Sequence, residues 1–561
     1  MAAISHISSS RTSKGLTLAS LPPEIVDLIL DFAIPQPPEI GETKPVSYNQ
    51  LIPNEPWFDF TRSRHGLWGL CLGSRAFSAL AYPRLYSVMA LLDEESMFLY
   101  FRTLAERPHY GTWTRYLSCH LTLTSEPVIR DTRRAVGRKL RTFRPASEPA
   151  VLMSAIRKAL DIMAISLPHM STVAGDFDYV PQVILAFILA FTPHLDTLLL
   201  QVPINEDYLD YSALFDKLHL IAGPRRHQHP HFATSPYQPP SPHPFNNLTT
   251  LLLQGDPELL EQYENSEDRE FELPEIWGVQ ARCYLPLYEC FPNLSTLEIS
   301  TDDGVWSNLL DEEDLFLSSD SSHNHPYLNQ IRHLYLHNSV TCPRNLHYVL
   351  RNAPRLQTLY MTPLRDRTYY RGPKEDSPDA HPEALDVALA SHAPHLRHLD
   401  VAWFEVSGHE GMIGADGRLA SLPRMHRLEK LCIQLAVLYG CSPATMETPL
   451  VELLPPNLVE LALEDYWWWN LEDYDAMGEW TPRQKLAHYR GSKEYRNTAL
   501  RMLAGLAESV GQRMPALKRV MLLCRIPWTW MIEDGVELDS HFDEVRTAFE
   551  AQGVEFLVDE V

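Results

Sequence analysis

The sequence predicts an α/β chain in which an irregular solenoid with a parallel sheet follows a short helical N-terminal module. One phrase, Pro-x-Leu-x-x-Leu-x-Leu, returns along the chain and ends each time in apolar residues with a period of two, which is typical of a short strand. Helical patterns precede several of these phrases, and alternating helices and strands favour parallel strands with crossover connections. Such repetition indicates units that bury their apolar faces only by stacking on one another.

The phrase and its variants predict nine strands. Full copies begin at Pro193, Pro292, Pro354, Pro394 and Pro456, and variants lie at 248–253, 331–336, 428–433 and 517–522. Helices are expected before four of them, at 183–191, 345–352, 383–391 and 499–510. A doubly wound α/β domain is the alternative. It is less favoured because the sequence holds no Gly-rich phosphate loop.

The phrase resembles the leucine-rich repeat. Its spacing is uneven and the Asn position of that family is missing, so the units are degenerate members of the type. The resemblance predicts a repeat domain over 110–561. Proline-rich, acidic or charged segments predict loop insertions in it at 224–244, 256–275 and 365–382.

The N-terminal module begins with Leu21-Pro22-Pro23-Glu24-Ile25. Proline suits the first turn of a helix, where its missing N–H would have had no partner, and Ser20 lies where an N-cap belongs. Apolar residues then recur at helical spacing, and a second helix is expected with Leu67, Leu70, Cys71, Phe77 and Leu80 on its apolar side. So few short helices bury little core, which indicates that the module leans on a neighbour or a partner.

Together with Ser74-Arg75-Ala76-Phe77 and Pro83-Arg84-Leu85-Tyr86, this start resembles an F-box. The resemblance implies a module at 18–91 with an insertion at 35–66, behind a disordered N-terminus at 1–17. It implies docking on the Skp adaptor of a cullin-type ubiquitin ligase. The positions that match the apolar pattern of the family, and so would touch the adaptor, are Leu21, Pro22, Ile25, Ile29, Leu72, Phe77 and Leu85. The alternative is a helical cap on the next domain.

Composition excludes several other classes of function. The formal charge of −24 argues against sequence-independent nucleic-acid binding, which needs a basic face. Eight scattered cysteines without a C-x-x-C pair indicate a reduced protein of the cytoplasm and/or nucleus. The longest apolar run, 183–191, is too short to span a bilayer, and 1–19 lacks the apolar block of a secretory signal, although its Ser-rich composition also resembles a transit peptide. The basic segment 130–144 has two interpretations. It is either a nuclear localisation signal or binding site for an acidic partner, or a solvated charged helix or loop.

No pattern predicts catalytic, cofactor-binding or metal-binding residues. The alternating histidines at 227–231 and 323–325 lack Cys or His partners at ligand spacing, and the glycines at 411, 414 and 417 lack a Lys-Ser/Thr. An active site assembled from distant positions remains an alternative, without positive support.

The residue between the last two leucines of each phrase points away from the core, toward a face that solenoids use for binding. These residues are Leu199, Leu252, Glu298, Tyr335, Tyr360, Asp400, Cys432, Ala462 and Met521. The residues expected to bind a target are Glu298, Tyr335, Tyr360 and Asp400, with Trp403, Tyr466 and Trp467 just beyond neighbouring strands. Acids beside aromatics favour a target with a basic segment. The tryptophans at 467–469 have the alternative of packing beneath a loop.

These observations predict a substrate-recognition adaptor of a cullin-type ubiquitin ligase, with the Skp adaptor and cullin core as partners and no nucleic acid or membrane. A repeat scaffold that binds proteins without any ligase is the alternative.

Overall fold

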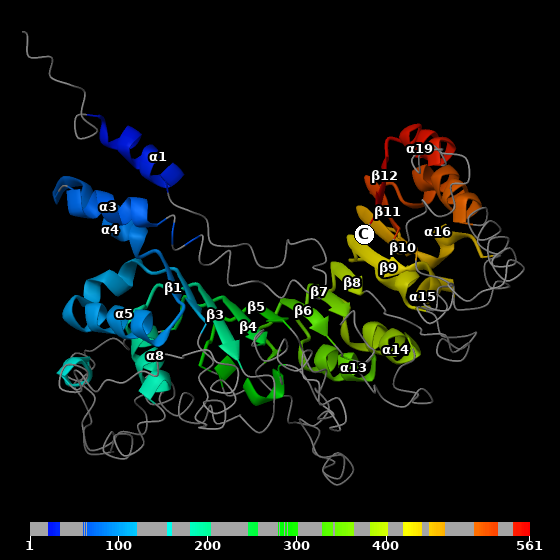
Figure 1. Cartoon of the computed structure of the whole chain (residues 1–561). Helices are drawn as coiled ribbons and strands as arrows, with labels where there is room; N and C mark the ends of the chain where they lie inside the picture. The colour runs from blue at the N-terminus through cyan, green and yellow to red at the C-terminus, as the bar shows by residue number, and fades with distance from the viewer. Residues whose placement is uncertain are drawn as a thin grey trace, which may run out of the picture.

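The computed structural model describes part of the chain. The described residues are 21–33, 60, 62, 64–73, 75–120, 154–159, 180–202, 245–255, 279, 281–284, 287–288, 290–300, 328–339, 341, 343–363, 382–401, 419–439, 448–465, 499–524 and 542–560. Within them, twelve strands form one curved sheet that opens upward in Figure 1. No helix in these ranges is long and apolar enough to cross a membrane.

All neighbouring strands of the sheet are parallel, and their order in the sheet is their order in the chain. The strands are β1 (Val88–Leu91), β2 (Tyr116–Cys119), β3 (Thr197–Val202), β4 (Thr250–Gly255), β5 (Thr296–Ser300), β6 (His333–Ser339), β7 (Thr358–Pro363), β8 (His398–Val401), β9 (Lys430–Gln434), β10 (Glu460–Asp465), β11 (Arg519–Cys524) and β12 (Glu555–Glu560). A doubly wound sheet reverses its strand order at a switch point. This sheet has no reversal, so the solenoid prediction is confirmed.

The nine repeated phrases form β3 to β11. The strands β1, β2 and β12 lie outside these nine phrases and extend the sheet at both ends. β1 lies inside the range expected for the N-terminal module, yet it pairs with β2 as the first strand of the sheet. The sheet therefore begins at Val88, before the repeat domain was expected to start.

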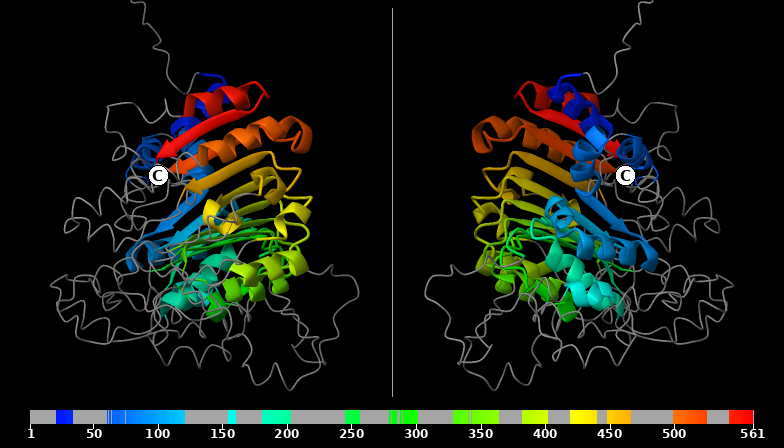
Figure 2. Two further views of the ribbon diagram at one scale, coloured as in Figure 1. Left: turned by 90° about the vertical axis from the view of Figure 1, so that its right-hand side faces the viewer. Right: turned by 90° about the vertical axis from the view of Figure 1, so that its left-hand side faces the viewer.

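Helices and 3-10 turns cover the outer face of the curved sheet, and the inner face stays concave (Figures 1 and 2). They are α5 (Glu94–Glu106), η2 (Pro108–Trp113), α8 (Val180–Phe191), η8 (Ala281–Tyr284), α13 (Pro343–Asn352), α14 (Pro382–His392), η12 (Leu422–Arg424), α15 (Leu435–Tyr439), α16 (Leu450–Leu453), helical residues 499–513 and α19 (Asp543–Glu550). The four helices expected from periodicity are confirmed as α8, α13, α14 and 499–513.

The core between the sheet and the helices is one continuous cluster that runs from Leu91 to Phe556. The centre of this core is a row of side chains in register across consecutive strands, and each is at most 2 % exposed. They are Leu198, Leu251, Leu297, Leu334, Leu359, Leu399, Leu431, Leu461 and Val520. Burying one leucine side chain contributes about 1.5–3 kcal/mol. Each repeat obtains this only from its neighbours, as stacking predicts.

Lateral hydrogen bonds join the turns that precede the strands. Asn247 donates from Nδ2 to the Pro193 carbonyl (2.8 Å), Asn293 to the Asn246 carbonyl (2.6 Å) and Asn457 to the His426 carbonyl (2.7 Å). Each asparagine lies just before the first leucine of its phrase. Three of the turns are therefore joined by an asparagine side chain, which the resemblance to the leucine-rich repeat did not predict.

The N-terminal module contains α1 (Pro23–Ala33), α3 (His65–Gly73) and α4 (Arg75–Leu85) around a small core of Val26, Leu30, Leu67, Cys71, Ala81 and Leu85. The single second helix expected here is wrong, because the segment divides into α3 and α4. Glycine is a poor helix residue, and α3 ends at Gly73. Ser78 donates to the Cys71 carbonyl at 2.6 Å and so satisfies an acceptor that the end of α3 leaves free.

An aromatic cluster joins this module to the solenoid. The Tyr86 ring centroid lies 4.8 Å from that of Tyr110, and the Tyr110 ring stacks on Trp113 at 4.8 Å. Tyr86 contacts both the small core and the main core. Only two residues separate α4 from β1. The module is therefore attached directly to the first strand.

Gly111 gives a test of how η2 packs against α8 and α5. A Cβ there would overlap the backbone oxygen of Phe191, at the end of α8, and also lie 3.3 Å from Leu104. We expect Gly111→Ala to lower the free energy of unfolding by about 1–3 kcal/mol. Gly505 is the matched control, because a Cβ there has nothing within 4 Å. Gly505→Ala should raise stability by about 0.5–1 kcal/mol, since it lies in a helix. Urea unfolding measures both, and equal effects would contradict the packing.

Candidate protein-binding surfaces

The concave face carries a central row of side chains that are in register across the sheet. The row runs through Ala90, Ser118, Leu199, Leu252, Glu298, Tyr335, Tyr360, Asp400, Cys432, Ala462, Met521 and Leu557. The alternation of each phrase predicted nine of these positions for one shared row. The register confirms that prediction.

The row is covered at its N-terminal end. Phe60 packs with Ala90, Leu199 and Leu252, and these two leucines are only 1 % and 6 % exposed. The expectation that Leu199 and Leu252 line an open binding face is therefore wrong. Phe60 belongs to the expected insertion at 35–66, so part of that segment folds onto the sheet and limits the accessible face to later strands.

Arg64 holds this cover in place. Its guanidinium donates to the Leu85 carbonyl and lies 3.4 Å from the Met89 sulfur, and its Cζ lies 5.5 Å from the centroid of the Phe60 ring. Burial lowers the pKa of Arg64 to about 10, so it remains charged at neutral pH. This partly buried cation ties the cover to both α4 and β1.

Rings and a carboxylate meet at the centre of the face, on β5, β6 and β7. The Tyr335 and Tyr360 ring centroids are 6.0 Å apart, and His337 lies 5.2 Å from Tyr360. Glu298 Oε1 lies 3.1 Å from His337 Nε2. Tyr335 and Tyr360 are both partly exposed, so the cluster presents ring faces beside a carboxylate.

The pKa shifts indicate a negative potential at this centre. Burial, and then Glu298, raise the pKa of Tyr335. Burial raises the pKa of Tyr360, with further contributions from Asp400, Cys432, Glu464 and Glu298. A cation placed against these rings would gain from both the carboxylates and the ring faces.

The structure brings together four of the residues expected to bind a target: Glu298, Tyr335, Tyr360 and Asp400. Trp403, Tyr466 and Trp467 lie outside the described residues. Two members were missed, His337 and Glu464. Each lies two residues after a predicted member of the row, so the same alternation would have found both.

The N-terminal module carries an exposed apolar surface. Ile25, Leu28 and Ile29 of α1 are 46 %, 63 % and 37 % exposed, and Trp68 and Leu72 of α3 are 54 % and 66 % exposed. Leu28 and Trp68 were not among the expected adaptor contacts, although the helical spacing of Leu28 with Ile25 marks it as a surface neighbour.

The other expected adaptor contacts differ in burial. Pro22 is exposed, Leu21 and Phe77 are partly buried against the small core, and Leu85 is one of its buried members. Leu85 therefore supports the module from within.

No group of three potential metal ligands occurs among the residues that the structure describes. The histidines at 227–231 and 323–325 and the glycines at 411, 414 and 417 lie outside those residues, as do the basic segment 130–144 and the three expected loop insertions. No family model matches the chain, and no curated protein is significantly similar to it.

His120 at the end of β2 makes the stability of the concave face depend on pH. It is buried beside the Ser118 hydroxyl, and burial lowers its pKa to about 4. Between about pH 6.5 and 4 the unfolded chain binds a proton at this histidine and the folded chain does not. The free energy of unfolding should therefore fall as the pH falls through this window.

We expect His120→Gln to remove up to about 3 kcal/mol of that loss, measured as the difference in unfolding free energy between pH 7 and pH 4.5. The exposed His426 gives the control, and His426→Gln should leave the pH dependence as in the parent. The same pH dependence in parent and His120→Gln proteins would contradict this role.

Proposed function

We propose that this chain is a substrate-recognition adaptor of a cullin-type ubiquitin ligase, which docks on the Skp adaptor through α1 and α3 and holds a target on the concave face. The observation that carries the proposal is the apolar surface of the module. Five of the eight exposed large apolar side chains in the described ranges lie on these two short helices. Such clustering is typical of a protein interface.

The direct attachment of the module supports this function. With two residues between α4 and β1 and the aromatic cluster across the junction, the helices keep a fixed orientation relative to the sheet. A target on the face would be presented at a defined place relative to the ligase core. The chain would act by raising the effective concentration of the target near the ubiquitin-loading machinery, without catalytic residues of its own.

A repeat scaffold without a ligase is the second candidate, because the concave face alone would also bind a protein. The two candidates differ in what the apolar surface of α1 and α3 contacts. Affinity purification of the full chain from cells separates them. Recovery of the Skp adaptor and a cullin supports the first candidate.

The first functional prediction concerns adaptor docking. Ile25→Ala with Leu72→Ala removes two exposed apolar anchors and spares the small core. Truncating such anchors costs about 2 kcal/mol or more, roughly a thirtyfold loss of affinity for the Skp adaptor. Val387→Ala on α14 is the control, because Val387 is also apolar and 52 % exposed but far from the module. Adaptor recovery that is unchanged in the double variant would rule out this docking site.

The second functional prediction concerns binding of the target by the concave face. We expect Tyr335→Ala with Tyr360→Ala to lose the proteins that the parent chain captures through its concave face, while adaptor recovery stays unchanged. Tyr348→Ala on α13 tests whether loss of any tyrosine has the same effect. Quantitative mass spectrometry of captured proteins measures both. The concave-face model fails if the double variant keeps all its partners or loses the adaptor with them.

A further inference from the structure

A row of arginines follows the edge of the sheet where β6 to β9 begin. Arg332, Arg355, Arg397 and Arg427 lie in four consecutive turns, and all four are exposed. We call this row the arginine edge. Backbone hydrogen bonds join its turns, from Gln357 N–H to the Arg332 carbonyl (2.7 Å) and from Arg397 N–H to the Gln357 carbonyl (2.8 Å). Arg332 and Arg397 share one register position with Gln357 between them, and Arg355 and Arg427 lie two residues earlier in their turns. Each of four successive strands therefore has one arginine near its start.

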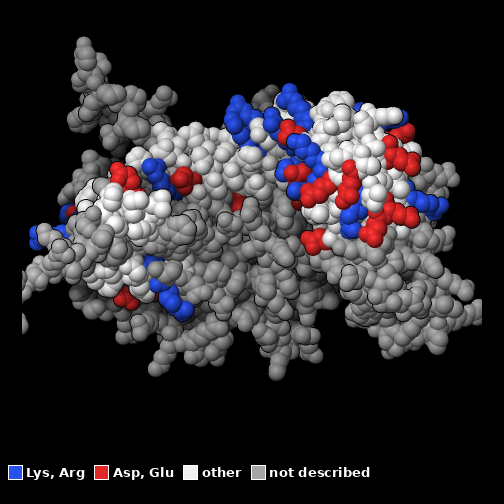
Figure 3. Space-filling model, turned by 90° about the horizontal axis from the view of Figure 1, so that it is seen from above, with Lys and Arg blue, Asp and Glu red and all other residues white. Residues whose placement is uncertain are grey.

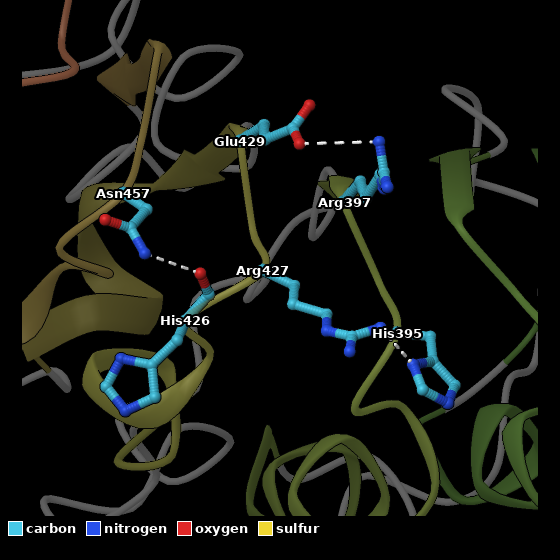
Figure 4. A network of polar contacts seen from close by, with 6 residues as sticks. All are labelled: His395, Arg397, His426, Arg427, Glu429 and Asn457. Carbon is cyan, nitrogen blue, oxygen red and sulfur yellow. Dashed lines mark hydrogen bonds and ion pairs between the residues drawn. The ribbon is translucent and has the colours of Figure 1, made fainter.

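Polar contacts orient two of the four guanidinium groups, those of Arg397 and Arg427 (Figure 4). Arg427 donates to His395 Nδ1 at 2.7 Å, a contact with an uncharged acceptor. Arg397 lies 3.6 Å from Glu429, with the two side chains 58 % and 50 % exposed. An ion pair this long and this exposed is weak, so the Arg397 fork stays available to another carboxylate.

The charge of the edge also acts on a histidine beside it. The pKa of His333 is lowered by burial and then by Arg332.

The charge of the four arginines is opposite in sign to the net charge of −24. Figure 3 shows Lys and Arg side chains gathered along one margin near the middle of the molecule. A local positive edge on a strongly acidic chain selects for an anionic partner.

We propose that the arginine edge binds an acidic segment, rich in Asp and Glu, of a protein partner. The four guanidinium groups lie one on each of four successive strands, alternating between two positions of the turn. This arrangement lets each meet a different carboxylate of an extended chain. A phosphoryl group is a single point of charge and favours forks that converge on it. Nucleic acid is disfavoured, because the remaining surface of so acidic a chain repels a phosphate backbone.

This surface goes beyond the proposed function, because it needs neither the Skp adaptor nor the concave centre. The same strands nevertheless carry both surfaces: Arg332 and Tyr335 belong to one repeat, and Arg355 and Tyr360 to the next. A target with a basic residue beside an acidic run would contact the two surfaces together.

The test uses the full chain and a fluorescent peptide of about ten glutamates, with binding measured by anisotropy. We expect the parent chain to bind the peptide and Arg355→Gln with Arg397→Gln to weaken binding by about tenfold or more. Arg501→Gln with Arg513→Gln changes the net charge equally on the helical layer and should stay within about twofold of the parent. Binding should weaken steeply between about 50 and 200 mM salt.

Three results would overturn the proposal. They are the absence of glutamate-peptide binding by the parent chain at low salt, an equal loss in both double variants, and tighter binding of a singly phosphorylated, otherwise neutral peptide than of the glutamate peptide. Adaptor recovery with Arg355→Gln/Arg397→Gln, which should be unchanged, keeps failure of this surface distinct from failure of the ligase assignment. Thermal unfolding of each variant confirms that it is folded.

Discussion

Stacking of buried leucines between neighbouring strands is the constraint on which the rest of the structure depends. Leu297, for example, lies in register between Leu251 and Leu334, and none of the three can be buried by its own repeat. The leucines are buried between the outer face of the sheet and the helices. The residues of the concave face are therefore not required to form this core. The rings and carboxylates of the concave centre can therefore vary with little cost to the core. Function and stability are divided between two faces of the same strands.

Aromatic packing occurs in the first and in the last repeat that the structure describes. In the last one, the Phe549 ring of α19 stacks on Phe556 of β12 at 5.3 Å within the core. At the N-terminus α4 and η2 meet through Tyr86 and Tyr110. The N-terminal module is thus a cap for the solenoid on one side and an exposed apolar surface on the other. A helical cap and a docking module were the two interpretations of this segment. Each describes a different side of it, so a capping role does not argue against docking.

Local periodicity made β3 to β11 and the outward row predictable from sequence, because a strand that buries one face must alternate. β1, β2 and β12 lack the Leu-x-x-Leu-x-Leu pattern and so gave no repeated signal. The division into α3 and α4 was not predicted, because the apolar spacing of the segment continues across Gly73. The burial of Leu199 and Leu252 depends on Phe60, more than a hundred residues away in the chain, and contacts at that distance have no period. The three asparagine contacts were not predicted, because each amide bonds to a carbonyl of the preceding repeat. Three asparagines among nine phrases also give no repeated pattern in the sequence.

The accessible part of the molecule is electrically divided along β6 and β7. Glu298 and Asp400 lie beside the tyrosines of the concave centre, and Arg332 and Arg355 lie where the strands begin. The two charges lie within a few residues of each other on the same strands. They favour a partner whose basic group meets the concave centre while its acidic group meets the arginines, and they disfavour the same partner bound in the reverse direction. Hydrophobic contacts alone would not distinguish the two directions. The division of charge therefore supplies orientation as well as attraction.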